Sequence, residues 1–406
     1  MLRSGEMDYP ALAQSYYVRC REGFPGLRGL VLRGSREDMI PGVSDIDMRL
    51  ICQEGNPSVW LALDEVVQKV HLGFVTRGLP YRRALEHPPG ACVTVEEALD
   101  AALFHPEMRH WDWCAGDETV RQSLTRHLES LPWGERDERH HLSVFVGALQ
   151  PKVPPVRTQG LQVPERHRGV ASVALHAFLP ALQAALSLME RRAVAGRLEA
   201  VRRWLQLRPS DPLLTQMLEA AERGFDLSPD EDEAAAADLR RRCRQFLQEI
   251  APQVMVAAQF AGSQLEEAQS ARWPVDPLRA LHDAVRYFRI RRSHYRCFLG
   301  LVPDAELDYL ILNEIHTLRS LLTLPALRAY AALKWGQPEA IPEEVLDRMD
   351  SQLASSAEKD AVRQLCQLSD GAPGPNEARA RLHQAAELYP AYLAVLERML
   401  ADVRRR

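Results

Sequence analysis

The pattern of apolar residues changes along this chain from one that includes strands to one that is purely helical. In the first third, an alternating stretch such as Asp45–Cys52 follows a helical stretch such as Tyr9–Glu22. After about Leu131 the apolar residues recur at helical spacing. The sequence therefore predicts an α+β protein in which a short mixed sheet with helices is followed by a large all-α region.

Breaks rich in proline divide the helical part. The chain of 406 residues is long enough for two or three domains. A proline-rich connector runs from Pro151 to Pro164, and a second break spans Pro274 to Pro277. We therefore expect three domains, which comprise residues 1–130, 131–270 with the connector, and 271–406.

Composition excludes several classes of protein. The net charge of −5 provides no general field for gathering nucleic acid, so a dedicated nucleic-acid binder is disfavoured. The seven cysteines are scattered and form no Cys-x-x-Cys pair, which indicates a reducing compartment. We find no signal peptide and no stretch long and apolar enough for a membrane span. We expect a cytoplasmic protein, and the sequence leaves a homodimer open.

The expected elements of the first third occur in the order helix, strand, strand, helix, strand. The strands are Gly29–Arg33, Asp45–Cys52 and Tyr81–Glu86, and the second helix is Ser58–Phe74 with Ser58 as its N-cap. A capping box at Thr94–Glu97 opens a further short helix.

The stretch that carries chemistry lies between the first two strands. Gly34-Ser35 follows the first strand, and after nine residues comes Asp45-Ile46-Asp47. Glycine lets the backbone approach a triphosphate, and the Ser35 hydroxyl and nearby N–H groups can donate to phosphate oxygens. Carboxylates at i and i+2 of a strand share one face, roughly 6–7 Å apart along the backbone. This arrangement suits Mg²⁺ ions that bridge a triphosphate and an attacking oxygen.

This motif resembles the signature of the polymerase-β nucleotidyltransferase superfamily, which is Gly-Gly/Ser, a spacer, and two acids that alternate with apolar residues. Gly34, Ser35, Asp45 and Asp47 fill the places of the signature, and the resemblance covers about 110 residues. It implies that Asp45 and Asp47 bind Mg²⁺ and that Gly34 and Ser35 bind the triphosphate of ATP. Arg33 stands where the family usually has an apolar residue, and it could reach phosphate.

The resemblance also implies two further site residues. The family carries a third carboxylate on the next strand, where it acts as general base, and Glu86 at the end of Tyr81–Glu86 is our candidate. Glu96 and Glu97 are alternatives, but the capping box explains them without catalysis. Some small-molecule nucleotidyltransferases place a Gly-Lys on a helix of the second domain, where it reaches the phosphates. Gly196-Arg197 looks similar, and arginine also pairs with phosphate.

The sequence thus predicts an enzyme that transfers AMP from ATP to a small-molecule acceptor with release of pyrophosphate. The lack of a clear third aspartate leaves open a catalytically impaired nucleotide-binding regulatory protein of the same fold. Transfer to a tRNA or protein acceptor is a further alternative, because the stretch Arg286–Arg296 is dense in arginines and aromatics. The simpler interpretation of that stretch is a solvated helix face.

Overall fold

The computed structural model describes residues 7–40, 44–149, 170–222, 233–258, 276–368 and 373–405. Its one described sheet is mixed and has four strands in the order β3-β2-β1-β4. β1 pairs antiparallel with both β2 and β4, whereas β2 pairs parallel with β3. The strands are β1 (Leu27–Arg33), β2 (Met48–Cys52), β3 (Ala91–Thr94) and β4 (Trp111–Gly116). The α+β class predicted from the sequence is confirmed.

Helices surround this sheet in the N-terminal part. They are α1 (Tyr9–Gly23), α2 (Pro57–Val75), α3 (Leu79–Ala84), α4 (Val95–Ala98) and α5 (Glu118–Ser130), with the 3-10 turns η2 (Arg36–Asp38) and η3 (Pro106–His110). Local chemistry sets where the longer ones begin. Asp8 caps α1 through the N–H of Ala11, and Asn56, not the expected Ser58, caps α2.

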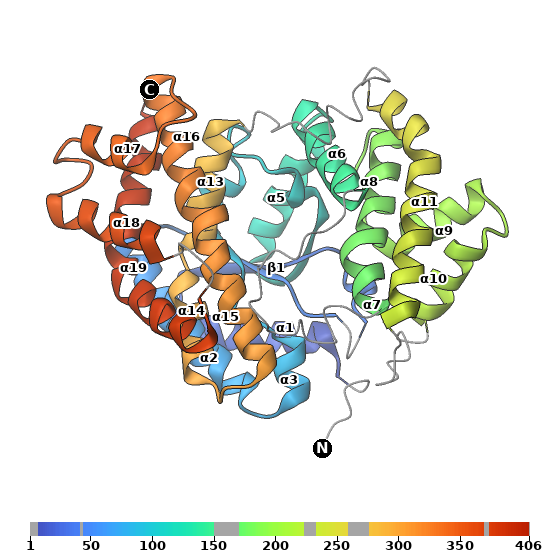
Figure 1. Ribbon diagram of the computed structural model, residues 1–406, viewed down its shortest axis with the longest axis horizontal. Helices are drawn as coiled ribbons and strands as arrows, with labels where there is room; N and C mark the ends of the chain where they lie inside the picture. Colours follow the sequence, from blue (N-terminus) through green and yellow to red (C-terminus); the bar gives the residue numbers. More distant parts are fainter. Residues whose placement is uncertain are drawn as a thin grey trace.

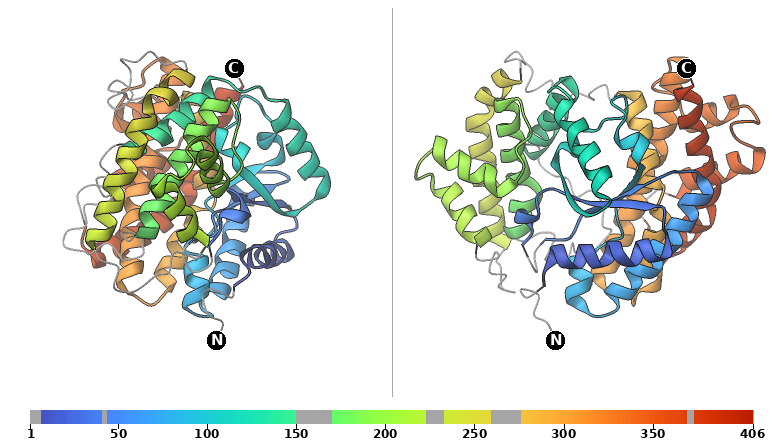
Figure 2. Two further views of the ribbon diagram at one scale, coloured as in Figure 1. Left: turned by 90° about the vertical axis from the view of Figure 1, so that its right-hand side faces the viewer. Right: turned by 180° about the vertical axis from the view of Figure 1, so that it is seen from behind.

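The remaining elements of the described residues are all helices, as the sequence predicts after about Leu131. One group comprises α6 (Glu135–Leu149), α7 (Val170–Val173), the π-helical turn η5 (Ala174–Phe178), α8 (Leu179–Glu190), α9 (Arg197–Leu207), α10 (Pro212–Glu222) and α11 (Glu233–Ala257). The other comprises α13 (Pro277–Phe288), α14 (Arg291–Gly300), α15 (Ala305–Thr317), the π-helical turn η6 (Leu318–Thr323), α16 (Leu324–Trp335), α17 (Pro342–Arg348), α18 (Ser356–Leu368) and α19 (Pro375–Arg404). The sheet lies between the two groups (Figures 1 and 2).

Both faces of the sheet are buried, because its residues alternate between two cores. Leu30, Leu32 and Leu50 belong to a large core that also holds residues of α1, α2 and the C-terminal helices α13 to α19. Val31 and Ile51 face a smaller core with residues of α5. A third core joins α6 to α11. The sheet and the C-terminal helices therefore share one core, while the predicted boundaries of the three domains stay a prediction.

The predicted strand Tyr81–Glu86 is wrong. Residues 79–84 form helix α3, which has Pro80 in its first turn and begins after Gly78 at φ +138°. Proline fits there because the N–H groups of a first turn have no partner within the helix. The strand parallel to β2 is instead β3, which leads directly into the predicted capping box of Thr94 and Glu97. β4 has no counterpart among the expected strands.

Candidate functional site

Asp45 and Asp47 lie immediately before β2, so the strand begins three residues later than predicted. The Arg33 N–H donates to the Asp47 carbonyl at 2.8 Å, which continues the pairing of β1 with β2. Ile46 and Met48 are buried in the large core and alternate with the two acids. The two carboxylates therefore share the opposite side, next to the end of β1.

A histidine that the sequence analysis did not single out completes this group. His87 follows α3, and its Nε2 lies 3.7 Å from Asp45 Oδ2 and 3.5 Å from Asp47 Oδ1. Each residue offers one ligand atom, and the three atoms lie within 4.8 Å of one another. Asp45, Asp47 and His87, which we call the triad, could together hold a metal ion.

Charges within the triad shift its protonation. Burial disfavours the charged form of His87, but a hydrogen bond to Asp47 and the charges of both acids raise the pKa of His87 to about 9. Burial also opposes ionisation of Asp47. Nevertheless His87, Arg49 and Arg33 together hold the pKa of Asp47 far below its usual value. Asp47 is thus a carboxylate near neutral pH.

The Gly34-Ser35 turn begins where β1 ends, one residue after the backbone pairing with Asp47. Gly34 has φ +97°, a conformation that favours glycine, and its N–H donates to the His110 carbonyl at 2.8 Å. A Cβ at Gly34 would meet nothing within 4 Å, so space lies open beside it. The Ser35 carbonyl accepts from the Asp38 N–H at 3.0 Å and starts the turn η2. The structure thus brings Gly34, Ser35 and the acids together.

Arg33 and Arg49 link Asp47 to a second buried carboxylate, Glu107. Arg33, which is partly exposed, places Nη1 3.5 Å from Asp47 Oδ2 and Nε 3.4 Å from Glu107 Oε2. Arg49 is buried and contacts Glu107 at 3.1 Å and Asp47 at 3.6 Å. Burial raises the pKa of Glu107, but Arg49, Arg286 and Arg33 bring it well below the usual value. Sequence reasoning missed Glu107, because it lies in η3, far along the chain from the motif.

Arg197 is the first residue of α9, and a carboxylate from the N-terminal part holds it there. Asp38 accepts from the Arg197 N–H at 2.6 Å and from the Leu198 N–H at 3.0 Å, and so caps α9. Burial and Arg33 lower the pKa of Arg197, while Asp38, Asp47 and Asp45 raise it. The predicted Gly196-Arg197 pair therefore lies within electrostatic reach of the acids.

Glu86 does not lie on a strand, because it follows helix α3. It is adjacent to His87 in the chain but is not one of the three ligand residues. Burial and the negative charge of Glu86 raise the pKa of Tyr309 in α15. The expected placement of a third carboxylate on the strand beside β2 is therefore wrong.

Four histidines gather beside the site from segments far apart in sequence. His105 immediately precedes η3 and His110 is its last residue, while His140 and His141 lie in α6. His110 Nε2 and His141 Nε2 are 3.0 Å apart, and the rings of His105 and His140 meet edge to face. Burial lowers the pKa of His110 to about 3, so this pair is neutral. The adjacent pair His140-His141 alone did not predict such a cluster.

Three of the five arginines in the basic stretch Arg286–Arg296 are buried in ion pairs, so the stretch is not a solvated helix face. Arg286, Arg289 and Arg291 are 1%, 2% and 8% exposed. Arg289 pairs with Glu97 and Glu397, and Arg291 pairs with Glu314. This stretch gives no support to a tRNA acceptor.

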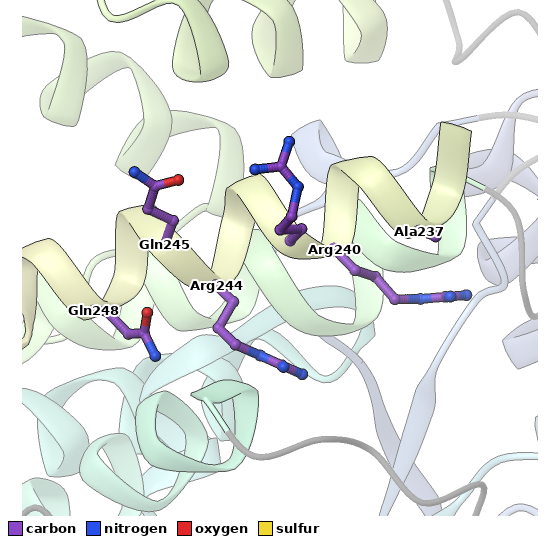
Figure 3. A pocket seen from close by; sticks show the side chains of 6 residues that line it. Ala237, Arg240, Arg244, Gln245 and Gln248 are labelled. Carbon is purple, nitrogen blue, oxygen red and sulfur yellow. The ribbon is translucent and has the colours of Figure 1, made fainter. Parts of the chain in front are cut away.

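An exposed basic patch lies elsewhere, on α11. Arg240, Arg241 and Arg244 line a shallow hollow of about 500 Å³ together with Gln245 and Gln248 (Figure 3). None of the triad residues lines this hollow. It is a surface of one helix face, and it contributes nothing to the chemistry of the carboxylates.

Comparisons of this chain with family models, with curated proteins and with solved structures gave no match. Among the described residues, no helix is both long enough and apolar enough to cross a membrane.

Proposed function

We propose that this protein is a nucleotidyltransferase of the polymerase-β type that transfers AMP from ATP to a small-molecule acceptor. The observation that carries the proposal is the convergence of the Asp45 and Asp47 carboxylates beside the Gly34-Ser35 turn. Few chemistries require two carboxylates next to a glycine turn with open space, and phosphoryl and nucleotidyl transfer are foremost among them.

In this proposal each residue has a defined role. Asp45 and Asp47 hold a divalent ion, which is Mg²⁺ if carboxylates alone set the preference, and which neutralises the phosphate charge and orients the phosphates. Gly34 lets the backbone come close to the phosphates, Ser35 donates to phosphate oxygens, and Arg33 and Arg197 offer guanidinium groups to the same charge. The open space beside Gly34 admits the triphosphate.

The reaction is an in-line displacement. An acceptor oxygen attacks the α-phosphorus, the bond to the bridging oxygen of the β-phosphate breaks, and pyrophosphate leaves. The proton of the acceptor must pass to a base. Glu107 is unsuited to this role, because three guanidinium groups depress its pKa and a weakly basic carboxylate transfers protons poorly. Glu86, which directly precedes His87 in the chain, stays the predicted base.

A regulatory protein that binds nucleotide without turnover is the second candidate. The observation that favours it is the ion pairing of Asp47 with Arg33 and Arg49 at 3.5 and 3.6 Å, which compensates its charge without a metal. Binding of ATP in isothermal titration, without release of pyrophosphate for any acceptor in a metabolite extract, would favour this candidate over the enzyme.

The test of the enzyme is pyrophosphate release in the presence of ATP, a divalent ion and a metabolite extract. Asp45→Asn or Asp47→Asn removes a metal-binding charge, and we expect a loss of at least about 100-fold with the fold retained. Asp117→Asn is the matched control. Like Asp47, Asp117 pairs with two arginines, which are Arg21 and Arg28. Asp117→Asn should leave the rate of pyrophosphate release within about twofold of that of the unaltered chain. Full activity in both acid variants would refute the assignment.

A further inference from the structure

We propose that Asp45, Asp47 and His87 form a three-ligand site for one transition-metal ion, and that this site selects Mn²⁺ over Mg²⁺. The inference goes beyond nucleotidyl transfer, because it concerns which ion binds and does not require any reaction. The two acids alone predict a magnesium site, and it is the histidine that changes the preference.

The spacing of the triad suits a single ion. Ligand atoms around one ion lie about 3.0–3.5 Å apart when the metal–ligand bonds are about 2.0–2.2 Å long. The Nε2 atom of His87 is already 3.5 and 3.7 Å from one oxygen of each acid. All three ligand atoms fit within 4.8 Å. Small rotations of the side chains would therefore close the shell around one ion.

The imidazole of His87 is held with Nε2 toward the acids. Its Nδ1 lies 2.6 Å from the Pro88 carbonyl, so Nδ1 carries the hydrogen and donates it. A histidine that binds a metal is commonly oriented in this way, by a carbonyl that fixes the other ring nitrogen. Nδ1 keeps its hydrogen when an ion binds, and the ion displaces the proton that Nε2 shares with Asp47 in the metal-free protein.

Neighbouring residues restrict the movement of the His87 ring. The ring stacks on that of His294, with centroids 5.4 Å apart and an interplanar angle of 18°. His294 is buried, and its Nε2 lies 3.1 Å from the Pro89 carbonyl. The Gly90 N–H donates to the Met48 carbonyl at 2.9 Å, which fastens this loop to the strand that follows the two acids. The ligand from the loop and the two ligands that precede β2 are thus fixed relative to each other.

The mixed donor set determines the preference among ions. Mg²⁺ favours oxygen ligands in a strict octahedron and rarely accepts imidazole, whereas first-row transition ions bind imidazole well. One imidazole beside two carboxylates therefore favours a first-row transition ion over Mg²⁺, and Mn²⁺ is the member of that series that shares the preference of Mg²⁺ for carboxylates. Three protein ligands also leave coordination positions open for water or phosphate, as in catalytic metal sites.

Arg33 and Arg49 compete with the ion for Asp47, but neither prevents binding. Their contacts with Asp47, at 3.5 and 3.6 Å, are longer than a close charge-assisted hydrogen bond. Arg49 has a nearer partner in Glu107 at 3.1 Å, and the partly exposed Arg33 can turn toward solvent or phosphate. An ion of charge +2 therefore finds Asp47 available.

The test measures metal binding alone, on the metal-free full chain without nucleotide. Mn²⁺ is titrated while the free ion is followed by electron paramagnetic resonance, and Mg²⁺ is then added as competitor. We expect one Mn²⁺ to bind per chain. We also expect Mg²⁺ to displace it only when the Mg²⁺ concentration exceeds the Mn²⁺ concentration at least tenfold. In His87→Asn, the affinity for Mn²⁺ should fall at least tenfold and that for Mg²⁺ less than threefold. His383→Ala removes an exposed histidine of α19 and should change neither affinity.

A second measurement on the unaltered chain guards against misfolding of the variant. Electron spin-echo modulation detects a nitrogen bound directly to Mn²⁺, and we expect the signal of one imidazole. Equal affinities for Mn²⁺ and Mg²⁺, absence of the nitrogen signal, or unchanged Mn²⁺ binding in His87→Asn would each overturn the proposal. Because no turnover is measured, Mn²⁺ binding without nucleotidyl transfer would refute only the proposed function. Nucleotidyl transfer that requires Mg²⁺ and proceeds at the same rate in His87→Asn would refute only this inference.

Discussion

At the scale of single residues, two carboxylates of the site, Asp47 and Glu107, are each paired with more than one cationic side chain. Asp47 faces His87, Arg33 and Arg49, and each of these cations lies within 3.6 Å of a carboxylate oxygen. A carboxylate with such neighbours stays ionised, so it is ready for a metal at any pH near neutrality. The same compensation keeps Glu107 ionised and prevents it from serving as a base.

Some of these residues could be read from sequence and others could not. Gly34, Ser35, Asp45 and Asp47 were identified because a local motif carries them. His87 was missed because its place depends on how α3 and the following loop pack against the sheet. The only sequence signal was a histidine ahead of Pro88-Pro89-Gly90, which resembles any turn.

A buried carboxyl outside the site gives a prediction for the pH dependence of stability. Asp64 of α2 is fully buried, and burial raises its pKa to about 7 although the Ser293 N–H donates to it at 2.6 Å. A pKa raised by folding means that the neutral form stabilises the fold. That contribution is complete below about pH 4, the ordinary pKa, and is lost as pH rises to 7.

Asp64→Asn keeps the acceptor for Ser293 and removes the titration. The free energy of unfolding of this variant relative to the unaltered chain should rise by about 1.4 kcal/mol per pH unit between pH 5 and 7. Urea unfolding at pH 5, 6 and 7 measures the difference. A difference that does not change with pH would contradict the assignment of this titration to Asp64.

At the scale of elements, the ends of helices and strands are set by a few residues, some of them distant in sequence. The start of α1 near Tyr9 and the capping box at Thr94 were predictable, because the signals are local. The cap of α9 is Asp38, from the turn after β1, and no periodicity in the sequence indicates it. Strand Tyr81–Glu86 was wrong because short apolar stretches suit helix and strand alike, and Pro80 favours the helix.

The turn after β1 gives a prediction about backbone conformation. Gly34 has φ +97° and open space around its Cα, so Gly34→Ala introduces strain without a clash. We expect a loss of about 1–2 kcal/mol in the free energy of unfolding and weaker binding of ATP. Chemical denaturation and isothermal titration measure the two effects.

Gly147 provides a control in which the same substitution should raise the free energy of unfolding. It lies within α6, is exposed, and would also place its Cβ in open space, but without an unusual φ. Gly147→Ala should stabilise the protein by about 0.5–1 kcal/mol because alanine favours helix. Equal effects of both substitutions would show that the conformation of Gly34 is not required.

At the scale of the whole molecule, the sheet and the C-terminal helices form one unit. The large core contains residues from Met7 to Leu400, so the two ends of the chain depend on each other. Figure 1 shows α13 and α19 on the same side of the sheet as α2. Sequence analysis predicted that the C-terminal part is helical, but it could not predict this shared core, since contacts between distant segments leave no periodic signal.

Substitution of Arg289 tests whether the sheet and the C-terminal helices depend on each other for stability. Arg289 is 2% exposed. Its Nη2 donates to Glu97 Oε1 of α4 at 2.7 Å, and its Nε donates to Glu397 Oε1 of α19 at 2.7 Å. Arg289→Met leaves two carboxylates without their shared partner. We expect a loss of about 3–5 kcal/mol in the free energy of unfolding, measured by denaturant titration.

Arg404 is the matched control for Arg289, because it also contacts two acids but at the surface. It lies 3.1 Å from both Glu96 and Asp100, and Glu96 is 80% exposed. Arg404→Met should cost about 0–1 kcal/mol. A cost for Arg289→Met no larger than that for Arg404→Met would mean that the buried ion pairs do not join the two ends of the chain.

The central claim is that the triad and the Gly34-Ser35 turn hold a metal ion with a nucleoside triphosphate. A crystal structure with Mn²⁺ and a non-hydrolysable ATP analogue, with anomalous scattering to locate the metal, tests it most directly. The account predicts a manganese peak within about 2.3 Å of a ligand atom of Asp45, Asp47 and His87, with the phosphates against Gly34 and Ser35. A metal or nucleotide bound away from these residues would contradict it.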